Sequence, residues 1–452
     1  MGLIKLSLIS LKKDLSKSMF YFLTFLLTTI FIFSFFNLVF NPYANINLGK
    51  DDSTFVTPIA VFVIIIAMIC VFLANNFYVS NKSKEISIIL MSGASVYQLG
   101  IYLFFQVFII MLLAIPLGWI LGYAFIPVIN SIFASTFVYQ GGLFYLSNKT
   151  VVATASILIF EVFWCSLVNL GYCVRSTINA IIQEKNKINF TGLKIKGAVW
   201  DYPTDTFELM IQEESETDST KKKGTEISDK IYILFYILPV FIFVFLEDSM
   251  SFLLFSLIGI IGLFGIIKKV LPHMIEKRQR NQSLENPIHL ISLGFFHSDI
   301  QKVFGLLIII LLSSILLTCV TVYTLNQPLV SMVALMSYIS VMILMSLTIV
   351  FKIGMELNKR KKNFQNLCYL GYSLKQLKQI ICVEMQLFYG VILLLPLIYQ
   401  IVILCNLLLS KQITIYLTII IFIIQITPVM ISYLISIKLY SSILPASMID
   451  ER

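Results

Sequence analysis

The sequence has little charge and few of the residues that build catalytic or metal sites. Only 13% of its 452 residues are charged, whereas 58% are hydrophobic. A soluble domain carries roughly 25% charged residues, so most of this chain is unsuited to a water-exposed surface. The three histidines have no metal-ligand spacing, and no Gly-x-x-x-x-Gly-Lys segment is present to bind a nucleotide. We therefore expect a non-catalytic chain without a metal or cofactor of its own.

Disulfide bonds are not expected either. The seven cysteines fall in apolar runs or in loops that we place on the inner side of a membrane, and no Cys-x-x-Cys pair occurs. A disulfide framework needs paired cysteines in an oxidising compartment. The cysteines therefore give no sign of a disulfide-bonded external domain.

Long apolar runs dominate the sequence. A span needs roughly 20 apolar residues to cross the hydrocarbon core of a membrane. The first run follows residue 18 and is too long for a cleavable signal sequence. The fifth and sixth runs are short and are joined by Glu247-Asp248-Ser249, as in a tight helical hairpin. The sequence predicts ten spans, at residues 19–40, 55–75, 101–125, 151–173, 231–246, 250–267, 303–323, 330–351, 381–408 and 413–437.

The distribution of positive charge predicts the orientation of these spans. Of the 33 lysines and arginines, only Lys50, Lys149 and Lys411 fall outside if the N-terminus is inside and the spans alternate. Positive residues collect on the cytoplasmic side of membrane proteins. We therefore expect a multi-pass protein of the cell membrane with both termini in the cytoplasm. The net charge of +9 is then a topology signal and not a sign of nucleic-acid binding.

An internal repeat relates the two ends of the chain. Residues 82–99 and 360–377 superpose with one constant shift, which aligns Gly93 with Gly371 and Ser95 with Ser373. Amphipathic segments lead into a span ahead of each copy, at residues 5–20 and 288–304. The fold class predicted is all-α, with two parallel four-helix repeats and a central two-helix hairpin.

The repeat and the apolar runs together predict five segments along the chain. They are a first four-helix unit at 1–175, a cytoplasmic linker loop at 176–230, a transmembrane hairpin at 231–267, an amphipathic connector at 268–302 and a second four-helix unit at 303–452.

Each repeated segment predicts a rigid bend between two helices. Glycine permits the left-handed turn that ends a helix, and serine two residues later can cap the next helix. We name these bends the first elbow (residues 82–99) and the second elbow (residues 360–377). Each elbow runs directly into a span, so two matched elbows are suited to docking a symmetric partner.

The first elbow resembles the coupling segment of FtsX-like ABC transporter permeases. The pattern Lys-x-Lys-Glu-Ile-x-Ile-Ile-Leu…Gly-Ala-Ser carries this resemblance, and the second elbow is a degenerate copy. Ten spans with a hairpin and a linker between two such domains are similar to the bacitracin-export-type (BceB-like) permeases. The positions matching the coupling motif are Glu85, Gly93, Ala94 and Ser95 in the first elbow, and Asn363, Gly371 and Ser373 in the second.

The resemblance implies partners and a role. Such permeases bind two copies of a cytoplasmic ATPase, which holds the ATP and Mg, and the coupling segments pass its closure to the spans. In the BceB-like branch the substrate is an antimicrobial peptide, often sensed together with a histidine kinase. This chain departs from that branch because only residues 324–329 stand where those permeases carry a large external domain. A substrate is then expected to contact the spans themselves, as a hydrophobic peptide or a lipid.

Glu161 is a further candidate site, because it lies midway along the fourth predicted span. An acid inside a membrane is a functional-site hypothesis by default. The alternative is a structural glutamate that is satisfied by Asn169, Ser166 or a tyrosine. Two other functions also remain open: a regulatory or sensory membrane subunit, and a secondary transporter without an ATPase.

Overall fold

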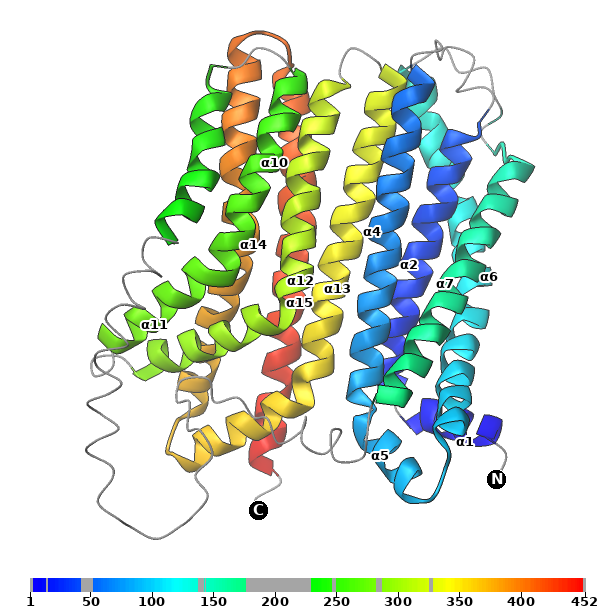
Figure 1. Cartoon of the computed structure of the whole chain (residues 1–452), viewed down its shortest axis with the longest axis vertical. Helices are drawn as coiled ribbons and strands as arrows, with labels where there is room; N and C mark the ends of the chain where they lie inside the picture. Colours follow the sequence, from blue (N-terminus) through cyan, green and yellow to red (C-terminus); the bar gives the residue numbers. More distant parts are fainter. Residues whose placement is uncertain are drawn as a thin grey trace. The chain divides into compact units, whose positions relative to one another are not determined.

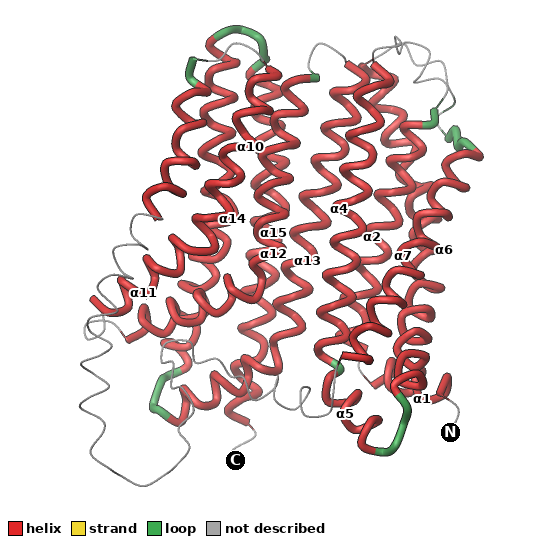
Figure 2. The backbone as a smooth tube through the Cα atoms, viewed as in Figure 1, coloured by secondary structure: helices red, strands yellow, loops and turns green. Residues whose placement is uncertain are grey.

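The structure is a computed structural model, and its described part is helical throughout. It describes residues 3–13, 15–41, 52–136, 142, 144–175, 229–245, 249–281, 287–324 and 328–449. Within these ranges there are helices, turns and short loops but no strand (Figure 2). The predicted linker at 176–230 and the predicted hairpin tip at Glu247 and Asp248 lie almost wholly outside the described residues. The all-α fold class is therefore confirmed for the described residues.

The helices follow one another in the order seen in Figure 1. The first half of the chain contains α1 (Leu3–Lys13), α2 (Leu15–Val39), α4 (Asp52–Asn81), α5 (Ser83–Met91), α6 (Val96–Thr136) and α7 (Asn148–Arg175). Residues 229–243 are helical as well. The remaining helices are α10 (Ser249–Gly265), the π-helical turn η1 (Ile266–Val270), α11 (Leu271–Asn281), α12 (Pro287–Tyr323), α13 (Pro328–Tyr369), α14 (Leu374–Leu409) and α15 (Ile415–Ile449).

Nine helices of the described part are long and apolar enough to cross a membrane. They match nine of the ten runs expected from the sequence, so a multi-pass membrane protein is confirmed. Of the remaining run, 231–246, the structure describes a helix over residues 229–243. The tenth span stays a prediction.

The chain divides into two compact units, each built from segments that are distant in the sequence. Unit 1 contains Met1–Lys187, Val320–Tyr372 and Ile420–Arg452. Unit 2 contains Ile188–Cys319 and Ser373–Ile419. Helix α13 and most of α15 thus belong with the helices of the first half. The units are defined by packing and the predicted segments by sequence likeness, so the predicted domain boundaries stay a prediction.

In unit 1, α2 is enclosed by α6, α7, α4 and α13. The glycines of α6 let α2 approach closely, because a Cβ atom added at Gly118 would lie 2.7 Å from the Thr29 side chain. On α4 and α7, Asn75 and Asn169 donate amide hydrogen bonds to each other at 2.7 and 3.3 Å. Tyr21 of α2 donates a third hydrogen bond to Asn75. Paired amides of this kind hold helices together where no water is present.

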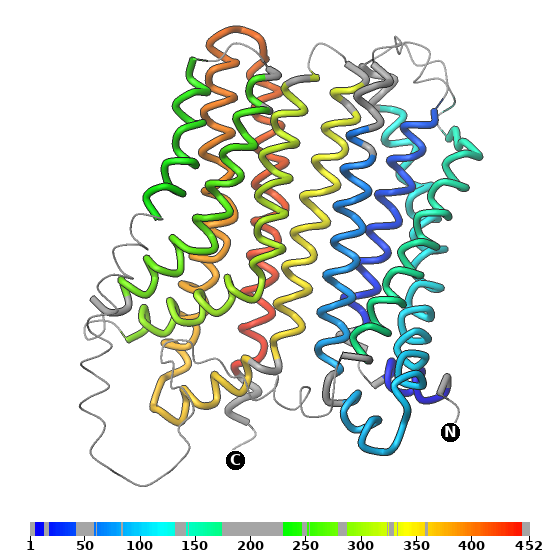
Figure 3. Tube along the Cα trace, viewed as in Figure 1, coloured from blue at the N-terminus to red at the C-terminus, as the bar shows by residue number. Residues whose placement is uncertain are grey.

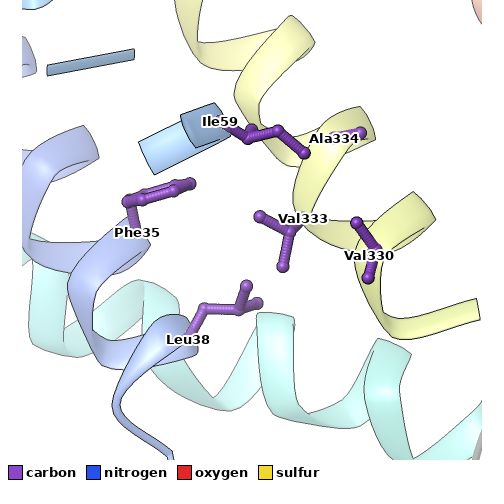
Figure 4. Packing of buried hydrophobic residues seen from close by; sticks show 6 residues of the cluster. All are labelled: Phe35, Leu38, Ile59, Val330, Val333 and Ala334. Atoms are coloured by element: carbon purple, nitrogen blue, oxygen red, sulfur yellow. The ribbon is translucent and has the colours of Figure 1, made fainter. Parts of the chain in front are cut away.

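Helix α13 packs along α2 and α4, and the three helices run side by side in Figure 3. At one end an apolar cluster joins them, with Phe35, Leu38 and Ile59 facing Val330, Val333 and Ala334 (Figure 4). Farther along, the ring of Phe20 lies 6.1 Å from that of Phe351. Helix α15 joins the same unit through a hydrogen bond from Tyr338 to Gln425. The core of unit 1 therefore combines helices from both halves of the sequence.

In unit 2, the helix at residues 229–243 is held tightly against α10 and α14. Tyr236 donates to the carbonyl of Leu395 at 2.6 Å, and Tyr399 donates to the carbonyl of Tyr236 at 2.5 Å. Gly262 of α10 leaves no room for a Cβ atom against the backbone of Tyr236. On α14, Gln400 donates to Ser314 and Thr318 of α12. These contacts fix the helix at 229–243 to its neighbours.

Candidate functional site

The first elbow has the bend that its sequence predicts. Helix α5 ends at Met91, and Gly93 has φ +88°, a left-handed conformation that a side chain would disfavour. The N–H of Gly93 donates to the Leu90 carbonyl at 3.1 Å, and the N–H of Ala94 donates to the Ile89 carbonyl at 3.3 Å. These bonds close the end of α5 as in a Schellman motif. The expected glycine turn is confirmed.

Ser95 then starts the next helix. The N–H of Ser95 donates to Gln98 Oε1 at 3.0 Å, and the N–H of Gln98 donates to Ser95 Oγ at 3.2 Å. This reciprocal pair is a capping box, which satisfies two donors at the start of α6. Helix α6 runs on from this cap to Thr136 and is one of the helices apolar enough to cross a membrane. The predicted cap is confirmed.

The second elbow repeats this backbone geometry. Gly371 has φ +93°. Its N–H donates to the Cys368 carbonyl at 2.9 Å, and the N–H of Tyr372 donates to the Leu367 carbonyl at 3.1 Å. Ser373 forms a capping box with Gln376 at the start of α14. Each of these bonds has a counterpart in the first elbow at the same sequence shift.

Glu85 lies in a polar cluster that joins α5 to α1 and α6. Its Oε2 accepts a hydrogen bond from Ser10 at 2.9 Å and another from Tyr102 at 3.3 Å. Lys82 Nζ lies 3.6 Å from the same oxygen. The Lys82 side chain is only 1% exposed, and that of Glu85 is 31% exposed. Glu85 thus faces the helices of its own unit, which its match to the coupling motif did not reveal.

Asn363 has no comparable cluster. It is partly buried on α13, and within the described residues its side chain makes no hydrogen bond. The residue aligned with Lys82 is Arg360, which is 3% exposed and lies over the ring of Tyr440 at 5.8 Å. Lys82 lies over the ring of Tyr78 in the same way, at 5.1 Å. Both elbows therefore bury a cation against a tyrosine, and in the first elbow this cation also lies beside the carboxylate of Glu85.

The surfaces of the two elbows also differ. The first elbow exposes apolar side chains, with Ile88 62% and Tyr97 69% exposed. The second exposes Tyr369 and Leu370 at 70% and 75%, and adds the exposed lysines Lys375 and Lys378. Large apolar side chains exposed beside a turn are typical of a protein interaction site. Sequence reasoning chose the turn residues and missed these exposed neighbours, although their apolar character between polar residues could have identified them.

Glu161 is buried on α7 in unit 1. Its side chain is 2% exposed, and neither carboxyl oxygen has a hydrogen-bond partner among the described residues. The expected partners bond elsewhere, since Asn169 pairs with Asn75 and Ser166 donates to the Val162 carbonyl. The structure therefore brings Glu161 together with none of the other candidate residues, and its role stays a prediction.

Comparison with protein-family models finds a match in the first half of the chain. Residues 58–170 match the family model described as FtsX-like permease C-terminal. The match runs from α4 to α7 and includes the first elbow, but it covers only about a quarter of the chain. No curated protein matches the sequence. Residues 58–170 are therefore similar to an FtsX-like permease domain, and this likeness and the long apolar helices of the described part support a place in the FtsX-like permease family.

Proposed function

We propose that the chain is the permease subunit of an ABC transporter. It couples ATP hydrolysis by a separate cytoplasmic ATPase to movement of its own helices. One observation carries the proposal: the two elbows share the same glycine turn and capping box, and the first lies inside the FtsX-like domain. ATP and Mg are then held by the ATPase, and this chain is a non-catalytic subunit.

The shared elbow geometry favours two ATPase copies, one for each elbow. It also favours the reading of the chain as two four-helix repeats with ten spans. The serines that precede the elbows support that reading. Ser7 of α1 donates to the Tyr102 carbonyl, and Ser292 of α12 donates to the Ile380 carbonyl at the aligned position, both at 3.2 Å. The charge distribution supports a topology in which both elbows and both termini are cytoplasmic.

The proposed substrate is a hydrophobic or antimicrobial peptide, or a lipid, that is exported or extracted from the membrane. The likeness to BceB-like permeases supports a peptide and a role in resistance. The short connection at 324–329 supports direct contact between substrate and spans, without an external domain. A sensor histidine kinase is a further candidate partner.

Purification of the tagged full chain from its own cells tests the proposal. We expect an ABC ATPase to remain bound, and ATP hydrolysis in vesicles to fall when the chain is removed. Absence of the ATPase, or hydrolysis that does not depend on the chain, contradicts the proposal. Ion-gradient-driven uptake without ATP would instead favour a secondary transporter, for which Glu161 is the candidate residue. Loss of signalling with intact transport would favour a sensory subunit.

A further inference from the structure

Helix α1 has the properties of a helix that lies in the membrane surface. It contains only residues Leu3–Lys13, which is too short to span, and the first span begins at Ser18. One side of α1 is buried against the unit, at Ser7 and Leu11. The other side exposes Leu8 and Ile9, at 49% and 48%, together with Lys5 and Lys12. Exposed apolar residues flanked by lysines are typical of a helix bound to an anionic lipid surface.

Figure 1 shows α1 at the same end of unit 1 as α5 and the start of α6. All three helices meet at the hydroxyl of Ser10. Its Oγ donates to Glu85 on α5 at 2.9 Å and accepts from Lys82 Nζ at 2.9 Å. It also accepts from Gln106 on α6 at 3.2 Å. A hydroxyl can donate one hydrogen bond and accept two, so the capacity of Ser10 is fully used.

Ser10 also bridges the ion pair of the first elbow. Lys82 Nζ and Glu85 Oε2 are 3.6 Å apart, which is beyond a good hydrogen bond, whereas each lies 2.9 Å from Ser10 Oγ. Lys82 is almost fully buried, so these contacts must offset the free-energy cost of removing its charge from water. Without the hydroxyl, α1 keeps its bond from Ser7 to α6 but loses the contacts of Ser10 with Lys82 and Glu85. Ser10 is therefore a polar link between α1 and the first elbow.

We propose that Ser10 is a positioning residue that ties the coupling helix α5 to α1, and that α1 binds the anionic membrane surface. The position of the first elbow is then set relative to the lipid headgroups as well as to the spans. This inference rests on the proposed function, because the elbow acts only if it receives the motion of an ATPase. It predicts that anionic lipid promotes coupling through α1 and Ser10.

The test uses the full chain with its co-purified ATPase in vesicles of phosphatidylcholine, with or without phosphatidylglycerol. Hydrogen–deuterium exchange is measured at residues 3–13 and 83–91, and ATP hydrolysis is measured in both lipids. We expect Ser10→Ala to raise exchange in both segments and to abolish the increase in hydrolysis caused by phosphatidylglycerol, which we expect to be about fivefold in the wild type. Ser10→Thr keeps the hydroxyl and restores both readouts. The amount of bound ATPase stays unchanged, which a general folding defect would not allow.

Ser7→Ala is the matched control, because Ser7 lies on the same helix as Ser10 and donates to the Tyr102 carbonyl of α6. We expect it to raise exchange at 3–13 and to leave 83–91 unchanged. Unaltered exchange at 83–91 in Ser10→Ala overturns the link itself. Raised exchange there, with an intact response to phosphatidylglycerol, overturns its role in coupling. If wild-type hydrolysis does not depend on the chain at all, the proposed function fails and the coupling role with it, while the exchange result still decides whether Ser10 holds α5.

Discussion

The two elbows share a backbone and differ in what surrounds it. Each has a left-handed glycine, a pair of bonds that closes the preceding helix and a serine–glutamine capping box. The first, however, is tied by Glu85 to Ser10 and Tyr102, whereas the second has Asn363 at that position. The second copy has Glu384 where the first has Gln106, and Glu384 is buried in α14. Both elbows thus share the glycine turn, but different side chains surround the turn in each of them.

The largest effect is expected from proline at either elbow glycine. Proline fixes φ near −65°, so Gly93→Pro and Gly371→Pro cannot adopt the observed φ of +88° and +93°. Each turn must then rearrange, at a cost of about 3 kcal/mol or more. We expect either variant to lose most of the ATP hydrolysis that depends on the chain, measured in vesicles with the ATPase.

Asparagine at the same positions is the control for this experiment. Asparagine tolerates the left-handed conformation better than other residues with a side chain. A Cβ atom at Gly93 or Gly371 would meet nothing within 4 Å. Gly93→Asn and Gly371→Asn should therefore keep most of the activity. Full activity in either proline variant would show that this elbow does not transmit motion.

The second prediction tests the difference between the elbows. Glu85→Leu leaves the buried Lys82 without its carboxylate, whereas Asn363→Leu removes no charge partner. Loss of one partner of a fully buried ion pair costs 3–5 kcal/mol, and we expect about 2 kcal/mol here because a third of the Glu85 side chain is exposed. Thermal unfolding of the two purified variants in detergent measures this difference. Equal destabilisation would show that the acid does not anchor the first elbow.

The backbone of the elbows was predictable from the sequence, and their anchoring was not. Glycine at a left-handed turn and serine at a helix start are local requirements that three neighbouring residues reveal. The cluster around Glu85 joins residues that are 17 to 75 positions apart, and it depends on how α1 packs. The motif at Glu85 instead suggested contact with an ATPase. The spans were predictable for the same local reason, because each apolar run must cover the membrane by itself.

The packing between helices that are distant in the sequence could not be predicted either. The repeat predicted two groups of four spans, yet α13 packs against α2 and α4 through small and apolar residues such as Ala334 and Ile59. Apolar runs do not identify their neighbours, since lipid and another helix are equally apolar surroundings. The close approach of Gly262 to Tyr236 was missed for the same reason. A small side chain allows a close contact only where another helix lies beside it, and the sequence does not say which helix that is.

The third prediction concerns the exposed apolar surface of each elbow. Replacing Ile88 and Met91 with serine in the first elbow, or Tyr369 and Leu370 in the second, removes side chains that are at least 60% exposed. These side chains contribute little to the fold, so thermal stability should stay within about 0.5 kcal/mol. If each elbow receives one ATPase, affinity for the ATPase should fall about tenfold in either double variant, as for residues at the centre of an interface. A titration of the ATPase against vesicle-bound chain measures this. Unchanged affinity in one variant would mean that only the other elbow docks a partner.

The smallest effect is expected at the capping serines. Ser95→Ala and Ser373→Ala each remove the side-chain acceptor at the start of a long helix, which costs about 1 kcal/mol. The two losses should be nearly equal, because Gln98 and Gln376 donate to their serines with similar geometry, at 3.2 and 3.4 Å. Hydrogen–deuterium exchange of residues 96–99 and 374–377 measures the fraying of each first turn. A large loss of protection from exchange at one elbow alone would show that the shared hydrogen bonds differ in strength. The two bends would then have the same shape but different rigidity.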